Sequence, residues 1–270
     1  MNILLIGNGK RTSILADNLK RFGYKVNHIY NTASIPLKIS ADLVVLPVPS
    51  VKNGYLNLEG IPLTIDNIVR RTEKHTLIIG CNIGAKHNNI VDLNDRDDFA
   101  YLNAIPTAEG AISIAISESD QSLFYSNILI TGFGRVSKIL ADRLRTMGKN
   151  VTIAARSLKD LSCAKALGYD TVNIKNLEKE ARKYDIIFQT VPAPIIADAV
   201  ILHLKSKALI IELSSGYIGT DCLSAENNSI KVIKAGGLPE KTAPITAGNI
   251  LTESVISIIN ERLPDHTLGG

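Results

Sequence analysis

The sequence predicts an α/β protein made of two doubly wound, Rossmann-like domains with parallel sheets and a cleft between the domains. One observation is an internal repeat, in which segment 3–26 aligns without a gap with segment 128–151. Another is that the apolar strands are continuous runs, such as "ADLVVLPVPS" and "YDIIFQTVPAP", which are typical of strands covered on both faces. The matched glycines of the repeat are Gly7 with Gly132 and Gly9 with Gly134.

Each copy of the repeat predicts a strand, a glycine turn and a helix, in that order. Apolar residues recur at helical spacing after each turn, and "ILAD" occurs in both helices. The helices are expected to end near Gly23 and Gly148, because glycine is favoured just beyond a helix. Right-handed crossovers then lead to further strands. These strands are expected within 41–50 and 76–84 of the first half and within 184–194 and 208–216 of the second.

The segment "NAIPTAEGAISIAISES" marks the expected domain boundary, because Pro106 interrupts the chain before an apolar run that predicts a buried helix from Ala108. A second crossing is expected in the Gly- and Pro-rich segment 235–250, and the closing helix 249–263 is expected to return to the first domain. The tail 264–270 is expected to be disordered. The expected domains are a substrate-side domain, 1–106 plus 246–270, and a dinucleotide-binding domain, 107–245.

Composition narrows the classes of function. The chain of 270 residues has a net charge of +4 with no block of like charges and no Trp, so no nucleic-acid surface is predicted and small anionic ligands fit better. The three cysteines lie far apart and form no CxxC, so neither a metal site nor a disulfide framework is predicted. The N-terminus lacks a leader pattern and no apolar run reaches the roughly 18 residues of a membrane span, so a cytoplasmic location is expected.

The stretch "ILITGFGRVS" (128–137) predicts a pyrophosphate-binding turn. Its glycines let backbone N–H groups approach the pyrophosphate at the start of a helix, and Ser137 stands in the third glycine position of the usual fingerprint. The second domain is favoured over the first, because small hydroxyl residues follow its later strands, where a dinucleotide would lie. The expected cofactor-binding residues are Gly132, Phe133, Gly134, Arg135, Val136, Arg156, Ser157, Thr190, Val191, Pro192 and Ser214, with Ser215 beside them.

Arg156 favours NADP over NAD. An acidic residue at this distance from the glycines binds the ribose 2′-hydroxyl of NAD, whereas Arg accommodates a 2′-phosphate. Arg156 and Ser157 together form a plausible phosphate clamp, since guanidinium binds phosphate through paired hydrogen bonds. NADP is therefore the expected cofactor, with NAD as the alternative.

Four motifs in order carry a resemblance to a known family: "NAIPTAEGAI", "GFGRVSKILA", "VTIAARS" and "GLPEKTAPITAG". Together they resemble the A subunit of dipicolinate synthase from spore-forming bacteria, and more distantly the two-domain plan resembles D-2-hydroxyacid and alanine dehydrogenases. The resemblance implies NAD(P)-dependent oxidation of a dihydro- or hydroxytetrahydro-dipicolinate from the lysine pathway to dipicolinate. It also implies a partner, the flavoprotein-like B subunit, together with a role in sporulation, in the mother cell.

A dicarboxylate substrate calls for cationic side chains and helix N-termini. The glycine turn of the first domain and nearby strand ends offer the expected substrate-binding residues Asn8, Lys10, Arg11, Ser50 and Asn82, together with Thr107. The candidate proton acceptors, in order, are Glu109, Lys241 and His87. Thr107 and Glu109 alternatively form the cap and first-turn charge of the interdomain helix. Cys81 is expected to be a small buried residue.

Two other functions stay open on the sequence. A 2-hydroxyacid or amino-acid dehydrogenase would use the same fold but commonly needs a His–carboxylate pair, which the sequence does not make obvious. A non-catalytic NADP-binding subunit that supports a flavoprotein would need no proton acceptor. The chain could also form a homo-oligomer.

Overall fold

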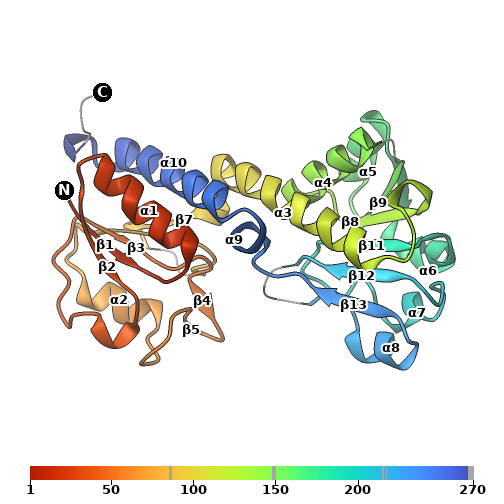
Figure 1. The fold of residues 1–270 in the computed structure, drawn as a ribbon, viewed down its shortest axis with the longest axis horizontal. Helices are drawn as coiled ribbons and strands as arrows, with labels where there is room; N and C mark the ends of the chain where they lie inside the picture. The colour runs from red at the N-terminus through yellow and green to blue at the C-terminus, as the bar shows by residue number, and fades with distance from the viewer. Residues whose placement is uncertain (85–86, 148–149, 215, 217, 267–270) are drawn as a thin grey trace. The chain divides into compact units, whose positions relative to one another are not determined.

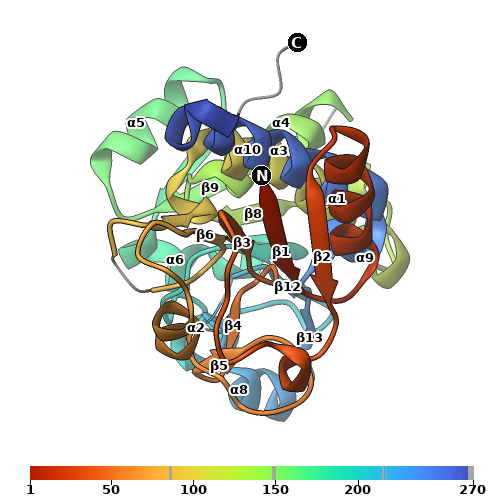
Figure 2. The same cartoon turned by 90° about the vertical axis from the view of Figure 1, so that its left-hand side faces the viewer.

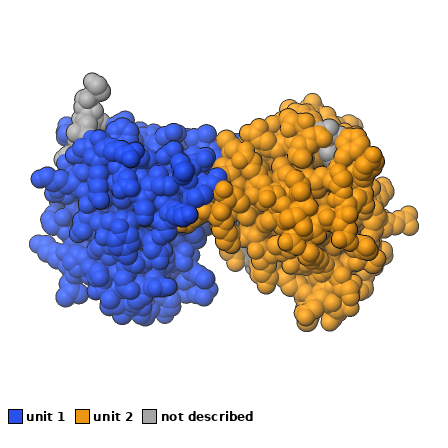
Figure 3. All heavy atoms as spheres, viewed as in Figure 1, with its two compact units in different colours: residues 1–103, 243–270 blue, residues 104–242 orange. Residues whose placement is uncertain are grey.

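A computed structural model describes residues 1–84, 87–147, 150–214, 216 and 218–266 (Figure 1). The chain divides into two compact units, which Figure 3 shows in different colours. Unit 1 comprises residues 1–103 and 243–270, and unit 2 comprises residues 104–242.

Unit 1 contains a five-stranded parallel sheet in the order β2-β1-β3-β6-β7. Counted along the chain this is the order 2-1-3-4-5, the flavodoxin-like version of a doubly wound sheet. A short antiparallel hairpin of β4 (Val51–Lys52) and β5 (Tyr55–Leu56) stands apart from it. The five parallel strands are β1 (Asn2–Ile6), β2 (Lys25–Ile29), β3 (Leu43–Val45), β6 (Leu77–Gly80) and β7 (Ile90–Asp92).

Helices cover both faces of this sheet. Alternate residues of β1 point to opposite faces, so Leu5 joins a core with α1 (Lys10–Arg21) and α10 (Pro244–Arg262), whereas Leu4 joins a core with α2 (Ile65–Arg71). Figure 2 shows α1 and α10 together on one side of the strands. The two helices can approach closely because residue 248 is glycine, since a Cβ at this position would lie 2.6 Å from Ile14.

Unit 2 contains a six-stranded parallel sheet in the order β10-β9-β8-β11-β12-β13. Counted along the chain this is 3-2-1-4-5-6, the strand order of dinucleotide-binding Rossmann domains. The predicted fold class of two doubly wound α/β domains is confirmed. The strands are β8 (Ile128–Thr131), β9 (Val151–Ala155), β10 (Asp170–Asn173), β11 (Ile186–Gln189), β12 (Leu209–Glu212) and β13 (Lys231–Lys234).

The helices of unit 2 also pack on both faces. The apolar stripe of α4 buries Leu140 and Leu144 against Ile130, while Leu129 faces the opposite core. Gly148, expected beyond the end of this helix, lies outside the described residues. The helices are α4 (Arg135–Thr146), α5 (Leu158–Ala166), α6 (Leu177–Glu180), α7 (Asp198–Ile201), α8 (Cys222–Asn227) and α9 (Leu238–Thr242).

The helix α3 (Asp97–Glu118) corrects the expectation that Pro106 interrupts the chain. Pro106 lies inside the helix, which begins nine residues earlier with two acidic residues in its first turn. A proline removes one N–H donor, and here the buried face formed by Ala108 and its neighbours keeps the helix continuous. Thr107 and Glu109 are consequently interior helix residues and not a cap and a first-turn charge.

Three further expectations can be compared with the structure. By length and composition alone α3 could cross a membrane, although no such run was expected, but its Ala108, Ala111 and Ala115 are buried in the core of unit 2. The expected second crossing does fall in the segment 235–250, since unit 2 ends at Thr242 and α10, which begins at Pro244, packs in the core of unit 1. Pro264–His266, expected to be disordered, form a short 3-10 helix.

Candidate functional site

The candidate site of unit 2 lies at the carboxyl ends of β8 and β11. These strands are neighbours at the centre of the sheet, and the chain leaves them toward opposite edges, which makes this the point where doubly wound sheets bind nucleotides. The glycine turn follows β8 directly, and the loop 190–193 follows β11. The predicted cofactor residues of both segments therefore meet in one place.

The two glycines of the turn have different reasons to be glycine. Gly132 has a φ of 79°, in the left-handed region, and a Cβ there would lie 2.7 Å from Val191 Cγ2. Gly134 has a φ of −81°, which any residue can adopt, and a Cβ there would meet nothing within 4 Å. Space is thus left open above Gly134, where the turn fits the close approach of a ligand.

The start of α4 is suited to an anion. Gly134 is its N-cap and supplies no side chain, and the first turn contains no acidic residue. The first N–H groups of a helix have no intrahelical acceptor, and they carry the positive end of the helix dipole. These N–H groups and the open space at Gly134 fit the pyrophosphate of a dinucleotide.

Buried polar residues, which the sequence reasoning missed, end three neighbouring strands. Thr131, Gln189 and Glu212 are the last residues of β8, β11 and β12, and all three are buried. The Gln189 side chain accepts from the Val191 N–H at 3.2 Å and from the Thr131 hydroxyl. A polar residue closing an otherwise apolar strand was the signal that could have found them.

Glu212 holds the next loop. Its buried carboxylate accepts from the Gly219 N–H at 3.1 Å and from the Thr220 hydroxyl at 2.8 Å. It also accepts from both the N–H and the hydroxyl of Ser214. The predicted cofactor residue Ser214 is thereby held against the sheet end, while Ser215 lies outside the described residues.

The remaining predicted cofactor residues divide by burial. Phe133 is a core residue whose ring packs edge-on against Tyr169, so only its backbone belongs to the turn. Arg135 and Val136 are half-buried in the first turn of α4, and Val191 and Pro192 lie at the loop after β11.

Arg156 and Ser157 follow β9. Arg156 is exposed, and within the described part of the chain it makes no hydrogen bond or ion pair. Ser157 caps α5, accepting from the Asp160 N–H at 3.4 Å. The guanidinium is therefore available to a phosphate, and the hydroxyl is already engaged as a helix cap.

The predicted substrate-binding residues in the glycine turn of unit 1 differ in their exposure to solvent. Asn8 and Lys10 are exposed at the start of α1. Arg11 is only 5% exposed, and its guanidinium donates to Asn103 Oδ1 at 3.0 Å and lies 5.4 Å from the Phe99 ring centroid. Arg11, which the sequence placed among the substrate-binding residues, thus ties α1 to α3.

The strand ends of unit 1 hold the other predicted substrate residues. Ser50 is fully buried, and its hydroxyl donates to Pro47 O at 2.7 Å and accepts from the Cys81 N–H at 2.8 Å. It joins two strand ends and offers no hydroxyl to solvent. Asn82 is exposed in a left-handed conformation, and its side chain accepts from Asn94.

Cys81 is buried, as expected. Burial, with a contribution from the nearby Asp92, raises the pKa of its thiol to about 12. A neutral, buried thiol is a packing group and a poor nucleophile.

The candidate proton acceptors lie in exposed positions. Glu109 is on α3 and Lys241 on α9, and these helices pack together where a Cβ on Gly110 would lie 2.9 Å from Thr242. His87 is exposed before β7, and its side chain makes no hydrogen bond or ion pair with the described residues. Within the described ranges no three His, Cys, Asp or Glu side chains gather as metal ligands.

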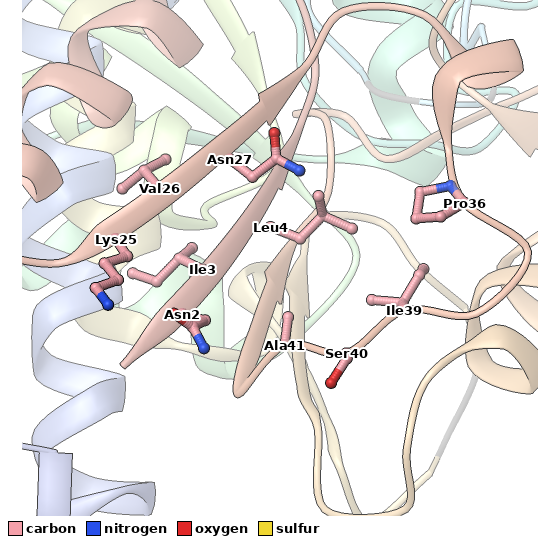
Figure 4. A pocket seen from close by; sticks show the side chains of 10 residues that line it. All are labelled: Asn2, Ile3, Leu4, Lys25, Val26, Asn27, Pro36, Ile39, Ser40 and Ala41. Atoms are coloured by element: carbon pink, nitrogen blue, oxygen red, sulfur yellow. The ribbon is translucent and has the colours of Figure 1, made fainter.

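A pocket of about 430 Å³ in unit 1 lies away from the glycine turn (Figure 4). It is lined by the amino-terminal half of β1, by β2 and by the loop 36–41. The turn follows the opposite, carboxyl end of β1. The pocket therefore contains none of the predicted site residues.

Known proteins resemble the chain in both sequence and structure. The family model described as "NADP oxidoreductase coenzyme F420-dependent" matches residues 127–216, which contain the glycine turn and the loop after β11. The A subunit of dipicolinate synthase from Bacillus subtilis (strain 168) is 32% identical over 244 residues, which cover 86% of this chain and 82% of that protein. The crystal structure of the dipicolinate synthase A subunit from Bacillus halodurans matches with a TM-score of 0.83 and 25% identity, covering 96% and 97% of the two chains.

A more distant structure shares the fold. D-2-hydroxyisocaproate dehydrogenase matches with a TM-score of 0.59 and 11% identity, over 99% of this chain and 98% of that one. The oxidoreductase family match on unit 2 and the Rossmann strand order support an oxidoreductase that uses a nicotinamide nucleotide. Because the sequence similarity extends over both units, the chain belongs to the family of dipicolinate synthase A subunits.

Proposed function

We propose that this chain oxidises a dihydro- or hydroxytetrahydro-dipicolinate to the aromatic dipicolinate, with NADP bound to unit 2 and with a second protein as its partner. The observation that carries the proposal is the open space at Gly134, at the start of a helix whose first turn has no side-chain cap and no acidic residue. Membership of the family of dipicolinate synthase A subunits supplies the substrate class. The same membership suggests a role in the cytoplasm of a sporulating cell.

The residues of unit 2 would bind the cofactor in three parts. The turn between Gly132 and Gly134 would hold the pyrophosphate with backbone N–H groups. Arg156 would bind the 2′-phosphate, because its exposed guanidinium is uncommitted among the described residues. The loop that begins at Thr190 would lie beside the ribose and pyrophosphate. The bound nicotinamide would supply the hydride acceptor.

The substrate is a dianion, and the turn of unit 1 offers groups that attract it. Asn8 and Lys10 are exposed beside the first N–H groups of α1, which has no acidic residue in its first turn. We assign carboxylate binding to these two residues. Arg11 supports the turn from beneath, through its contacts with α3.

Aromatisation of the dihydro form releases a proton from the ring along with the hydride, and the hydroxytetrahydro form must in addition lose its hydroxyl group as water. Glu109 is our first candidate to accept the proton, and Lys241 the second, because both are exposed on helices that pack together at Gly110. Positioned general bases contribute about 100-fold or more to a rate. Replacing Glu109 with Gln should lower kcat by about that factor and leave the NADPH dissociation constant unchanged.

A direct test is single-turnover formation of NADPH fluorescence when the purified chain is mixed with NADP and the lysine-pathway substrate. The wild-type chain should produce the signal, and Gly134→Val should abolish it by filling the space at the turn. Ala166→Val provides a control for the added side-chain bulk, since Ala166 is exposed at the end of α5, on the side of the amino end of β10 and away from the glycine turn. NADPH formation that survives Gly134→Val would place the cofactor elsewhere.

The partner needs a separate test. We propose that the partner is the flavoprotein-like B subunit, which should co-purify with the tagged chain when both are expressed together. Turnover by the pair that persists in Gly134→Val and Arg156→Asp would favour a non-catalytic role for this chain.

A further inference from the structure

The third position of the glycine fingerprint is occupied by a buried hydroxyl with a specific partner. Ser137 is 1% exposed, and its Oγ lies 2.8 Å from the Oγ1 of Thr190, in the loop after β11. The Thr190 hydroxyl donates to the Thr131 carbonyl at 2.6 Å. Since that donation uses the only Thr190 hydroxyl proton, we take Ser137 as the donor in the bond between the two hydroxyls; its Oγ also lies 3.5 Å from the Thr131 carbonyl.

The bond connects two segments that a dinucleotide would contact together. Ser137 is in the first turn of α4, whose N–H groups fit the pyrophosphate, and Thr190 begins the adjacent loop. The two segments also touch at Gly132, where a Cβ would lie 2.7 Å from Val191 and 3.2 Å from the Thr190 hydroxyl. The bond between the two hydroxyls therefore adds to a close contact between the segments that is possible only because residue 132 is glycine.

The loop is held from its other side as well. The Thr190 N–H donates to Thr131 Oγ1 at 3.1 Å. The Gln189 amide donates to Val191 O at 2.9 Å and accepts from the Val191 N–H at 3.2 Å. With its hydroxyl proton donated to Thr131 O, the Thr190 side chain has no donor left for a ligand.

We propose that Ser137 and Thr190 are paired positioning residues, which set the distance between the pyrophosphate turn and the loop after β11. The inference rests on the proposed cofactor site in unit 2. It means that Ser137 is half of a polar bridge in this chain and not a tolerated replacement of glycine. Restoring the fingerprint glycine should therefore weaken cofactor binding.

The test measures the NADPH dissociation constant by ligand fluorescence, and the unfolding temperature of each variant. Ser137→Gly and Ser137→Ala should each raise the dissociation constant about two- to tenfold, the range expected for one lost hydrogen bond. Thr190→Val also removes the bond to Thr131 O and should raise the dissociation constant at least as much. Thr190→Ser, which keeps the hydroxyl, should bind like the wild type. The double variant Ser137→Ala/Thr190→Val should bind no more weakly than Thr190→Val alone, because that variant has already lost the bond that Ser137→Ala removes.

The control for general destabilisation is Ser224→Ala, which removes another buried hydroxyl of unit 2, bonded to Asp198 Oδ1. Its unfolding temperature should fall while its dissociation constant stays at the wild-type value. Additive losses in the double variant, unchanged binding by Ser137→Ala and Ser137→Gly, or an equal loss in Ser224→Ala would each overturn the inference. If Gly134→Val also leaves NADPH binding unchanged, the proposed cofactor site itself is wrong, and the inference fails with it.

Discussion

The two glycine turns of this chain share one spacing but are connected to their surroundings in different ways. In unit 2 the third-position hydroxyl of Ser137 reaches across to the neighbouring loop at Thr190. In unit 1 the equivalent Thr12 donates back to its own turn, to Asn8 O at 3.2 Å. A repeat can therefore preserve the glycine spacing of a turn while each copy acquires its own polar partners, and these partners distinguish the functions we propose.

The first helical turn differs between the copies as well. The repeat pairs Arg11 with Val136, and the arginine is buried against α3 whereas the valine is half-buried at the start of α4. The second glycines differ in backbone conformation, with φ of 93° at Gly9 and −81° at Gly134. At its second glycine, the turn of unit 1 thus depends on glycine for its backbone conformation, whereas the turn of unit 2 has an ordinary conformation there and leaves open space.

The largest expected effect is a difference between the two glycine turns when the second glycine of each is replaced by alanine. Gly134→Ala meets no steric obstacle and should leave the free energy of unfolding near the wild-type value while abolishing measurable NADPH binding. Gly9→Ala forces a side chain into a glycine backbone conformation and should cost about 1–3 kcal/mol of stability. Urea unfolding and NADPH fluorescence measure both; equal stability losses would refute the contrast.

The next effect concerns the residue beyond the second strand of each unit. Arg156→Ala should raise the NADP dissociation constant about tenfold or more and change that of NAD little, since a hydrogen bond to a charged group contributes about 1.5–3 kcal/mol. Tyr30→Ala is the counterpart in unit 1, where the exposed ring stacks on His28 with centroids 3.9 Å apart. Tyr30→Ala should change neither the NADP nor the NAD dissociation constant. Equal losses of NADP and NAD in Arg156→Ala would remove the 2′-phosphate assignment.

A third test separates substrate binding from support within the turn of unit 1. Lys10→Ala should raise the substrate KM and leave stability unchanged, because Lys10 is exposed. Arg11→Ala should lower the free energy of unfolding by about 1–2 kcal/mol through lost packing and a lost hydrogen bond, and should leave the NADPH dissociation constant unchanged. A loss of NADPH affinity in either variant would place the nucleotide in unit 1.

The sequence predicts what depends on neighbouring residues and misses what depends on distant ones. The glycine turns, the parallel strands and the repeated helices follow from local patterns. The position of Pro106 inside α3 does not, because burial of Ala108 and its neighbours outweighs the local preference of proline. The bond between Ser137 and Thr190 joins residues 53 positions apart, and no local pattern contains it.

The smallest expected effect concerns a group of ion pairs in unit 1 that lies outside its glycine turn. Arg96 donates to Glu261 at 2.6 Å and to Asp98 at 2.7 Å, joining the start of α3 to the end of α10. The bond to Arg96 lowers the pKa of Glu261 to about 2, and the same guanidinium lowers the pKa of Asp98. In unit 2 the pair Lys207–Asp120 is 83% exposed at both side chains and is expected to contribute nothing measurable.

Glu261→Gln should therefore lower the free energy of unfolding at pH 7 by less than about 1 kcal/mol, since the Glu261 side chain is 46% exposed and solvent screens the pair. A carboxylate whose pKa is lowered by folding stabilises the protein above its unfolded pKa, about 4.3 for Glu, and this stabilisation is lost as the pH falls toward about 2. The difference between wild type and variant in urea unfolding should thus disappear between about pH 4.5 and pH 2. Asp120→Asn should show no difference at either pH, and a constant Glu261→Gln difference across this range would mean that the charge of Glu261 does not stabilise unit 1.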